Sequence, residues 1–466
     1  MTTYLQTLTH FVKGVIGAGI FSMGIAFKNG GLMFATIFTI VMGLLVLHCA
    51  TLVVRIIEYQ EWQKEGSKKQ ITKLNRTYAD IAEEVFEDGP PLAKTLAKYI
   101  KRTINILMCF MNLGFCCVYI VFIGNNMQKA LKFFEIEVSM SVVMLIFIIP
   151  MWLSSLITNL KWLAPVSTVA NAILFTAIGI TLYYISVDLR DFKSFSFIAS
   201  INTLPLFMAV ALYTFDCMSL VSHNFGPKLG KCINCLYLLV KVLPLRNEMD
   251  NPKRLVGLFG VMNMGFLIVT PIVVSLGFLA YLKYGDEIQG TIFLNLPEND
   301  IFVTVCVCII SYVILINLNE IYSRLVQVLL ILVCAQVMFT YAVQLYVPVT
   351  IMWPMVVDKY GPFKYELLFL LTFRTALVIL TLAIAEAIPF IDLIISLIGA
   401  ICSSCLTLLL PPILDIIISQ HKNKNKKEKS LRKKFVLIKN VLISTLAIVI
   451  FFTGVFTSVR NIINSL

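Results

Sequence analysis

The sequence predicts an all-α membrane protein that crosses the bilayer about eleven times. Of its 466 residues, 59% are hydrophobic and only 14% are charged, and the mean hydropathy is +0.87. A soluble globular protein has about a quarter of its residues charged. Apolar runs of about 20 residues, the length that crosses about 30 Å of hydrocarbon, also recur along the whole chain.

The apolar runs define the expected spans in order. They lie at 5–28, 31–54, 103–126, 139–157, 162–187, 201–220, 255–281, 325–350, 367–387, 391–414 and 435–458. The first run has no small-residue cleavage site, so we expect a span rather than a signal peptide. The main polar connectors are 55–102, 246–254 and 415–434. We therefore treat 1–466 as a single transmembrane domain.

The distribution of Lys and Arg predicts the orientation. Ten of the 38 lie in 55–102 and nine lie in 421–439, whereas the connectors on the opposite side hold five in total. The positive-inside rule places both basic segments in the cytosol, together with the N-terminus. The formal charge of +12 then belongs to cytosolic segments beside anionic lipid. No soluble domain is expected that could bind nucleic acid.

Residues 13–20, KGVIGAGI, predict a break within the first span. A glycine inside a helix costs about 1 kcal/mol relative to alanine, and Gly14, Gly17 and Gly19 stand close together here. Non-helical backbone occurs at membrane depth only where protein or a water-filled cavity covers it, as in the discontinuous helices of secondary transporters. The alternative is close helix packing through small residues. The spacing is not a regular GxxxG, which favours the break.

His10 is expected on the same helical stripe as Gly14 and Gly17, because these positions are spaced i, i+4 and i+7. Histidine changes charge within the physiological pH range, and an ionisable group inside a span suggests function. The alternative is a histidine at the cytosolic interface.

The lone CxxC at Cys232 and Cys235 lacks further ligands, so we expect no metal site and no cofactor.

Residues 6–32, QTLTHFVKGVIGAGIFSMGIAFKNGGL, resemble the first helix of the proton-coupled amino acid transporters of the amino acid/auxin permease superfamily, with its pattern TLxHxxKGxIGxGxxxxPxAxKNxG. ALYTFDCMSL and the later VLPLRNEMDNP are similar to its sixth helix and the following loop. Further collinear similarities lie at 113–126, 277–297, 340–354 and 388–413. The resemblance covers most of the chain.

The resemblance implies a LeuT-like fold of two inverted five-helix repeats plus one helix, with spans 1 and 6 broken around the substrate. It implies a solute carrier, not an enzyme, that moves small neutral amino acids and protons by symport, with the proton as coupling ion and His10 as the proton-coupling residue. The substrate-binding residues that it implies are Ile16, Gly17, Ala18, Gly19, Thr214, Phe215 and Asp216. Backbone amides of the first four would bind the carboxylate, and the last three would face the ammonium.

Four residues depart from the family pattern. Val15 stands where asparagine is frequent, Met23 replaces a usual proline, Asp216 replaces the commoner glutamate and Cys217 replaces a glycine. These departures bear on substrate preference more than on mechanism.

Two stretches do not fit the pattern. Residues 221–241 interrupt the sixth span, either as a loop displaced to the cytosolic side or, as we favour, as translated intron sequence. Residues 302–323 are apolar, but a twelfth crossing would move 421–439 outside. A re-entrant segment, a peripheral helix or a splicing remnant is therefore expected there. The whole chain could then be a non-transporting splice form.

An amino-acid sensor is a rival function, disfavoured by the short N-terminal tail, and an ion channel is a weaker one, for which no ring of charge is visible. The sequence does not separate plasma membrane from endolysosomal membrane, and predicts no oligomeric state.

Glu386 and Asp392 are expected to be solvated, and Arg374 to snorkel at a cytosolic helix end. Residues 77–102 predict an amphipathic helix interrupted at 89–91 and lying on the membrane surface.

Overall fold

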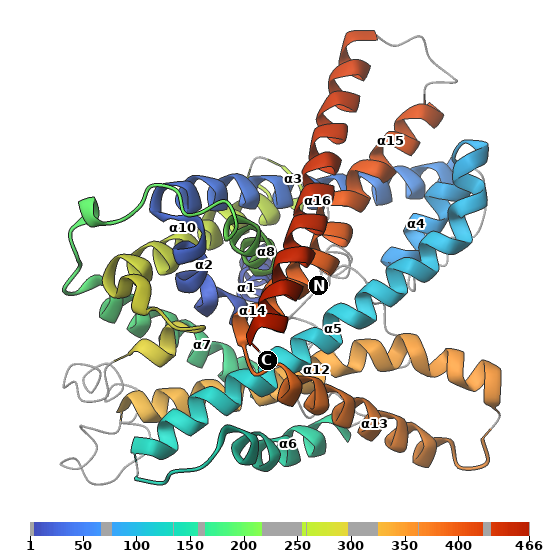
Figure 1. The fold of residues 1–466 in the computed structure, drawn as a ribbon. Coiled ribbons are helices and arrows are strands. Elements are labelled where there is room, and N and C mark those ends of the chain that lie inside the picture. The colour runs from blue at the N-terminus through green and yellow to red at the C-terminus, as the bar shows by residue number, and fades with distance from the viewer. Residues whose placement is uncertain are drawn as a thin grey trace.

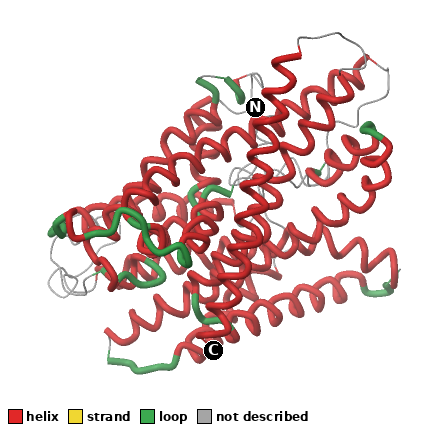
Figure 2. The backbone as a smooth tube through the Cα atoms, turned by 45° about the horizontal axis from the view of Figure 1, so that its top comes forward, coloured by secondary structure: helices red, strands yellow, loops and turns green. Residues whose placement is uncertain are grey.

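The computed structural model describes residues 4–66, 77–133, 135–156, 164–216, 254–257, 259–296, 325–361, 363–422 and 430–465. In this part of the chain the regular structure is helical throughout, and no strand is found (Figures 1 and 2). The suspected insertions, 221–241 and 302–323, lie outside the described residues, so the predictions made for them remain predictions.

The first half of the chain forms these helices: α1 (Tyr4–Val15), the 3₁₀ turn η1 (Ala18–Ser22), α2 (Met23–Gly30), α3 (Leu32–Gly66), α4 (Tyr78–Glu87), α5 (Pro91–Phe133), α6 (Met140–Leu156), α7 (Ala164–Ser186), the 3₁₀ turn η3 (Phe192–Ser194) and α8 (Leu204–Thr214). The second half forms α10 (Val261–Tyr284), the 3₁₀ turns η6 (Gly285–Glu287) and η7 (Ile292–Asn295), α12 (Leu325–Tyr360), α13 (Glu366–Ala387), α14 (Ile391–Ile398), the π-helix η8 (Gly399–Leu409), α15 (Leu410–Lys422) and α16 (Ser430–Ser465). Each of the eleven expected spans overlaps one of these helices or a consecutive set of them.

Seven of the described helical segments are long and apolar enough to cross a membrane. They are Leu32–Gln60, Pro91–Lys132, Val261–Glu287, Thr340–Tyr360, Glu366–Ala387, Ile391–Gln420 and Lys434–Ser465. Three shorter apolar helices cover Met140–Leu156, Leu174–Ser186 and Leu204–Thr214. The protein is therefore a multi-pass membrane protein, and the number of eleven crossings remains a prediction.

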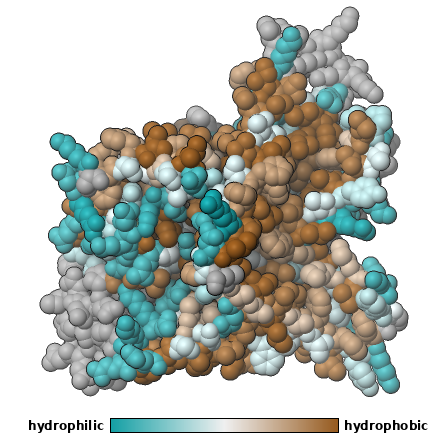
Figure 3. All heavy atoms as spheres, in the orientation of Figure 1, coloured by the Kyte–Doolittle hydropathy of each residue, from teal (hydrophilic) through white to brown (hydrophobic). Residues whose placement is uncertain are grey.

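The outer surface carries the side chains that a lipid-facing protein needs. Along α16, the side chains of Leu442, Phe452 and Phe456 are each about two-thirds exposed, at 65%, 67% and 68%. Figure 3 shows apolar residues over much of the visible face, with polar ones on its left side, near its centre and along its right edge. Such a surface is stable against hydrocarbon and would be costly in water.

The core brings the two ends of the chain together around α8. α5 packs against α12, α10 packs against α1, α2 and α3, and η8 packs against both α8 and α16. Figure 1 shows α5 crossing the molecule diagonally, with α12 and α13 on one side and α16 on the other. This arrangement places η1, the end of α8 and η8 next to one another.

The segment that leads into α8 is hydrogen-bonded to the junction of α2 and α3. The N–H groups of Leu32 and Phe34 donate to the carbonyls of Ser196 and Phe197, both at 3.1 Å, and the Ala199 N–H donates to the Gly30 carbonyl at 3.1 Å. Gly31 has a φ of +81°, and a Cβ there would lie 2.5 Å from the Ala199 nitrogen. Glycine is therefore required at this close approach.

The predicted interruption at 89–91 is present. α4 ends at Glu87 and α5 begins at Pro91. Thr77 caps α4: its side chain accepts from the Asp80 N–H at 3.2 Å, and the Asp80 carboxylate accepts from the Thr77 N–H at 2.8 Å. Lys101 of α5 then bridges Asp80 and Glu83 at 3.0 and 2.6 Å, which holds α4 against α5.

Two predictions about charged side chains are wrong. Arg374 is only 5% exposed, and its Nη1 donates to the Ser155 carbonyl near the end of α6 at 2.6 Å, so it does not snorkel. Its guanidinium also lies 5.7 Å from the centre of the Tyr346 ring. Glu386 is half-buried and its Oε1 is out of contact with water, while Asp392 is also half-buried. Packing against neighbouring helices, which the local sequence does not report, covers all three.

Candidate functional site

The predicted break in the first span is present in the structure. α1 ends at Val15, Ile16 and Gly17 are not helical, and the chain resumes as η1 before α2 begins at Met23. Gly17 is extended, with φ −110° and ψ −175°. Its carbonyl accepts from the Ile20 N–H at 3.3 Å. The first N–H groups of a helical turn have no acceptor within that turn, so this backbone can bind an anion.

The glycines of the break have different surroundings. A Cβ at Gly19 would lie 2.6 Å from the Tyr213 ring, so Gly19 is where η1 meets α8. At Gly17, by contrast, a Cβ would meet no described atom within 4 Å, and the residue is exposed. Both interpretations of the glycine pattern therefore apply, since Gly19 serves helix packing and Gly17 borders open space.

The end of α8 is bonded directly to this break. The Thr214 hydroxyl donates to the Val210 carbonyl at 2.9 Å and lies 3.4 Å from both the Gly19 carbonyl and the Met23 sulfur. Helix α8 stops at Thr214, and the Asp216 N–H donates to the Tyr213 carbonyl at 3.2 Å. The break in the first span and the end of α8 therefore meet here. Residues 217–253, which include the rest of the predicted sixth span, lie outside the described residues.

Asp216 is 6% exposed, and both of its carboxylate oxygens accept hydrogen bonds from η8. The Ser403 hydroxyl donates to Oδ2 at 3.0 Å, and the Thr407 hydroxyl donates to Oδ1 at 3.1 Å. The sequence pointed to Asp216 but not to either of these partners. The hydroxyl-rich run SSCLT within an apolar span was the available signal.

The two hydroxyl donors belong to a π-helix of 11 residues. Its i→i+5 bonding is rare and is frequent at functional sites. Their spacing of four residues is about one turn, so both can face the same carboxylate. Gly399 begins the π-helix, and a Cβ there would overlap the Ala209 carbonyl of α8. The irregular helix is thus packed tightly against α8.

Aromatic rings surround the junction. Phe115 of α5 lies 5.0 Å from Tyr213, and Phe215 stacks on Phe266 of α10 at 6.2 Å between ring centres. The Ser22 side chain at the end of η1 is fully buried, and its hydroxyl has no hydrogen-bond partner among the described residues. The junction therefore combines apolar walls with a few buried polar groups, as small-molecule sites do.

The structure brings together most of the sequence-predicted residues. Ile16, Gly17 and Gly19 form the break, and Thr214, Phe215 and Asp216 form the adjacent end of α8. Ala18 is the first residue of η1, and His10 lies within α1, but their side chains are outside the described part of the chain.

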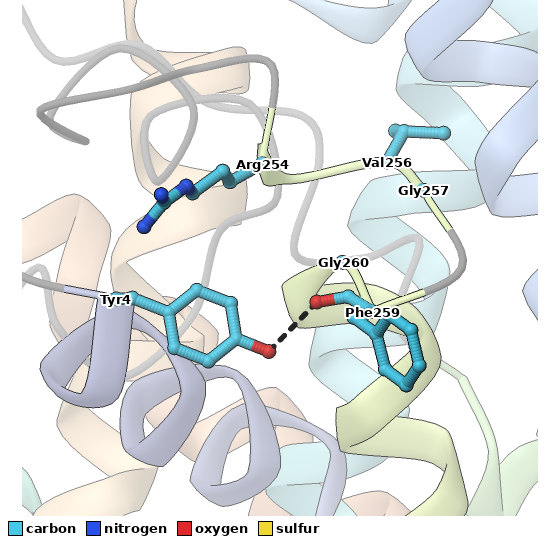
Figure 4. Close-up of a pocket in the computed structure, with 6 residues that line it drawn as sticks. All are labelled: Tyr4, Arg254, Val256, Gly257, Phe259 and Gly260. Carbon is cyan, nitrogen blue, oxygen red and sulfur yellow. Dashed lines mark hydrogen bonds between the residues drawn. The ribbon is translucent and has the colours of Figure 1, made fainter.

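Two cavities lie away from this junction. One, of about 480 Å³, is lined by Tyr4, Arg254, Val256, Gly257, Phe259 and Gly260. Figure 4 shows the Tyr4 hydroxyl donating to the Phe259 carbonyl, at 2.9 Å, across this cavity. The other, of about 620 Å³, lies between the end of α5 and the chain after α10, and is lined by polar residues that include Lys132, Glu137 and Gln289. Neither cavity includes a predicted substrate-binding residue.

Comparison with known proteins agrees with this geometry. The family model for transmembrane amino acid transporter proteins matches residues 1–223 and 229–457. The proton-coupled amino acid transporter-like protein pathetic of Drosophila melanogaster is 29% identical over 465 residues, covering 100% of this chain and 86% of that protein. The probable amino acid transporter skat-1 of Caenorhabditis elegans is 21% identical over 464 residues, covering 97% of this chain and 88% of that protein. With its broken first span and multi-pass helical structure, the chain belongs to the family of transmembrane amino acid transporter proteins.

Proposed function

We propose that this protein is a secondary active transporter that carries small neutral amino acids together with protons by alternating access, in a LeuT-like arrangement with broken spans 1 and 6. The observation that carries the proposal is the bonded junction between the interrupted first span and the end of α8, joined through Thr214 and Gly19. Discontinuous helices that meet at mid-membrane are how secondary transporters bind substrates. A similar protein whose name includes "proton-coupled amino acid transporter" supports the same function.

The substrate would bind at the break. Backbone N–H groups around Gly17 would bind the carboxylate, because amides without a helical acceptor favour anions. Carbonyls at Thr214 and Phe215, with the Asp216 carboxylate, would bind the ammonium. The open space beside Gly17 supports this position, and the rings of Tyr213 and Phe115 would limit the size of the side chain.

The proton would be the coupling ion and His10 the residue that carries it. Its position in α1, seven residues before Gly17, supports this role, because a charge change there acts on the helix that contains the break. The protein would act in the plasma membrane or the endolysosomal membrane.

Uptake of labelled alanine, glycine and proline into cells or proteoliposomes tests this function. Uptake would be compared at acidic and neutral external pH for the full chain and for a form lacking 221–241, with the surface amount of each measured. We expect acid-stimulated uptake, and its loss in His10→Gln. Uptake by the shortened form alone would identify the given chain as a non-transporting splice form. The absence of uptake by both forms, with protein at the surface, would refute the proposal in favour of a sensor.

A further inference from the structure

The proposed function assigns proton transfer to His10 and gives the buried carboxyl of Asp216 no role in it. Asp216 lies two residues beyond Thr214, and both of its oxygens accept hydroxyl hydrogens from the π-helix η8. Because an ionised carboxylate can only accept hydrogen bonds, this pattern is the one expected for the charged form. A protonated carboxyl carries a donor on one oxygen and is the weaker acceptor there, so the hydrogen bond from one of the two hydroxyls would weaken.

We propose that Asp216 takes up and releases a proton during the transport cycle, and that its ionised form ties the end of α8 to η8 through Ser403 and Thr407. The inference rests on the proposed function and adds a second proton-exchanging residue to His10. It makes the hydrogen bonds between the end of α8 and the π-helix η8 depend on one proton, so that proton uptake loosens the end of α8 from η8.

The surroundings of Asp216 suit a reversible change. Its 6% exposure makes the ionised form depend on the donors that the protein supplies, since few waters reach it. The titratable groups that lie near it in the described part of the chain are Tyr213 of α8 and Cys402 of η8, with Tyr119 and Cys116 of α5 behind Tyr213. An ionisable group inside a membrane protein that faces other helices is by default a functional group.

A short series of contacts connects Asp216 to the substrate position. Thr214 and Asp216 belong to the same short stretch of chain at the end of α8. The Thr214 hydroxyl lies 3.4 Å from the Gly19 carbonyl of the break. Gly399 at the start of η8 packs on the Ala209 carbonyl, one turn and a half before that stretch. A shift of η8 relative to α8 therefore changes the contact between α8 and the break.

The test uses the full-length protein in proteoliposomes, with two readouts. The first is uptake driven by an inward proton gradient, and the second is exchange of labelled for unlabelled substrate at equal pH on both sides. Asp216→Asn keeps the shape of the side chain but cannot be charged. We expect it to lose the stimulation of uptake by acid. Its exchange at equal pH should also fall, because Asp216 is proposed to contact the substrate ammonium, so acid stimulation is compared with the exchange rate of the same variant.

A milder pair of variants tests the hydrogen bonds that join Asp216 to η8. Ser403→Ala and Thr407→Val each remove one donor to the carboxylate, which makes its charged form less stable, so the pH of half-maximal uptake should rise by about one unit for each donor removed. Ser404→Ala is the matched control, because the Ser404 hydroxyl donates to the Ala400 carbonyl of its own helix. It should leave the pH profile unchanged.

Each other outcome has a distinct meaning. If the unaltered protein exchanges substrate but shows no acid stimulation, the proposed proton coupling fails. If the unaltered protein is stimulated and Asp216→Asn is stimulated equally, the role of Asp216 is refuted. If folded Asp216→Asn loses exchange entirely, an unchanged pH profile in the Ser403 and Thr407 variants would place Asp216 in substrate binding alone. If Asp216→Asn does not fold, an unchanged pH profile in the Ser403 and Thr407 variants overturns the inference.

Discussion

Gly19 and Gly17 stand two residues apart, yet Gly19 packs against another helix and Gly17 borders open space. The nearest neighbour of Gly19 is the Tyr213 ring, contributed by a helix almost two hundred residues later in the chain. The glycine pattern could therefore predict that the helix breaks, but not which glycine packs. The partners of Asp216 are equally remote, with 187 and 191 residues separating it from Ser403 and Thr407. The burial of Arg374 likewise comes from another helix, through Ser155.

Alanine substitution at these two glycines should give different results. Gly19→Ala places a Cβ 2.6 Å from Tyr213, and overpacking of this kind costs about 1–3 kcal/mol, so the melting temperature of the detergent-purified protein should fall. Gly17→Ala meets no described atom within 4 Å and has a backbone that any residue adopts, so its melting temperature should be unchanged. Its substrate uptake should fall, because the methyl group occupies the proposed carboxylate position. Equal thermal stability of the two variants would contradict this assignment.

At the scale of single elements, the described helices differ in how well the sequence predicts them. α4 could be predicted with its interruption, because Gly89 and the two following prolines end one helix and begin the next. The π-helix η8 could not be predicted, because π-helices have no distinctive amino-acid composition. This one depends on packing against α8 and α16. The end of α8 at Thr214 was implied by resemblance alone.

The capping box of α4 gives a prediction about that element. Thr77→Ala removes the cap and should destabilise α4 by about 1 kcal/mol, measured as faster hydrogen exchange of its amides. Substitution of the nearby Thr95, whose hydroxyl donates to the Pro91 carbonyl within α5, serves as the control. Unchanged exchange in α4 would show that Lys101, and not the cap, holds the helix.

The same box sets a dependence on pH. Burial raises the pKa of the Asp80 carboxyl, but the hydrogen bonds from Thr77 and the Lys101 charge outweigh it and hold this pKa below its usual value of 3.8. A lowered pKa in the folded state means that the stabilisation is complete above that usual value and is lost as the pH falls through the lowered one. Protection of α4 should thus be constant near neutral pH and decline only below about 4.

At the scale of the whole molecule, composition alone predicts the class, because 59% hydrophobic residues cannot face water. The positive-inside rule predicts the orientation from the basic segments, and eleven crossings would place the two termini on opposite sides of the membrane. An N-terminal epitope tag should then be accessible only after permeabilisation, and a C-terminal tag should lie outside the cell or in the organelle lumen. Both tags in the cytosol would instead mean an even number of crossings, as a spanning 302–323 segment would produce.

The backbone bonds between the α2–α3 junction and the chain entering α8 have a mechanical consequence. Three hydrogen bonds, from Leu32, Phe34 and Ala199, join these segments, and Gly31 admits no side chain between them. We expect α2 and α8 to rotate as one rigid arm, with the non-helical pair before η1 as its pivot. Helix α1, which lies before this pivot and packs on α10, would then move relative to the arm, so that access to the binding position opens on one side of the membrane at a time.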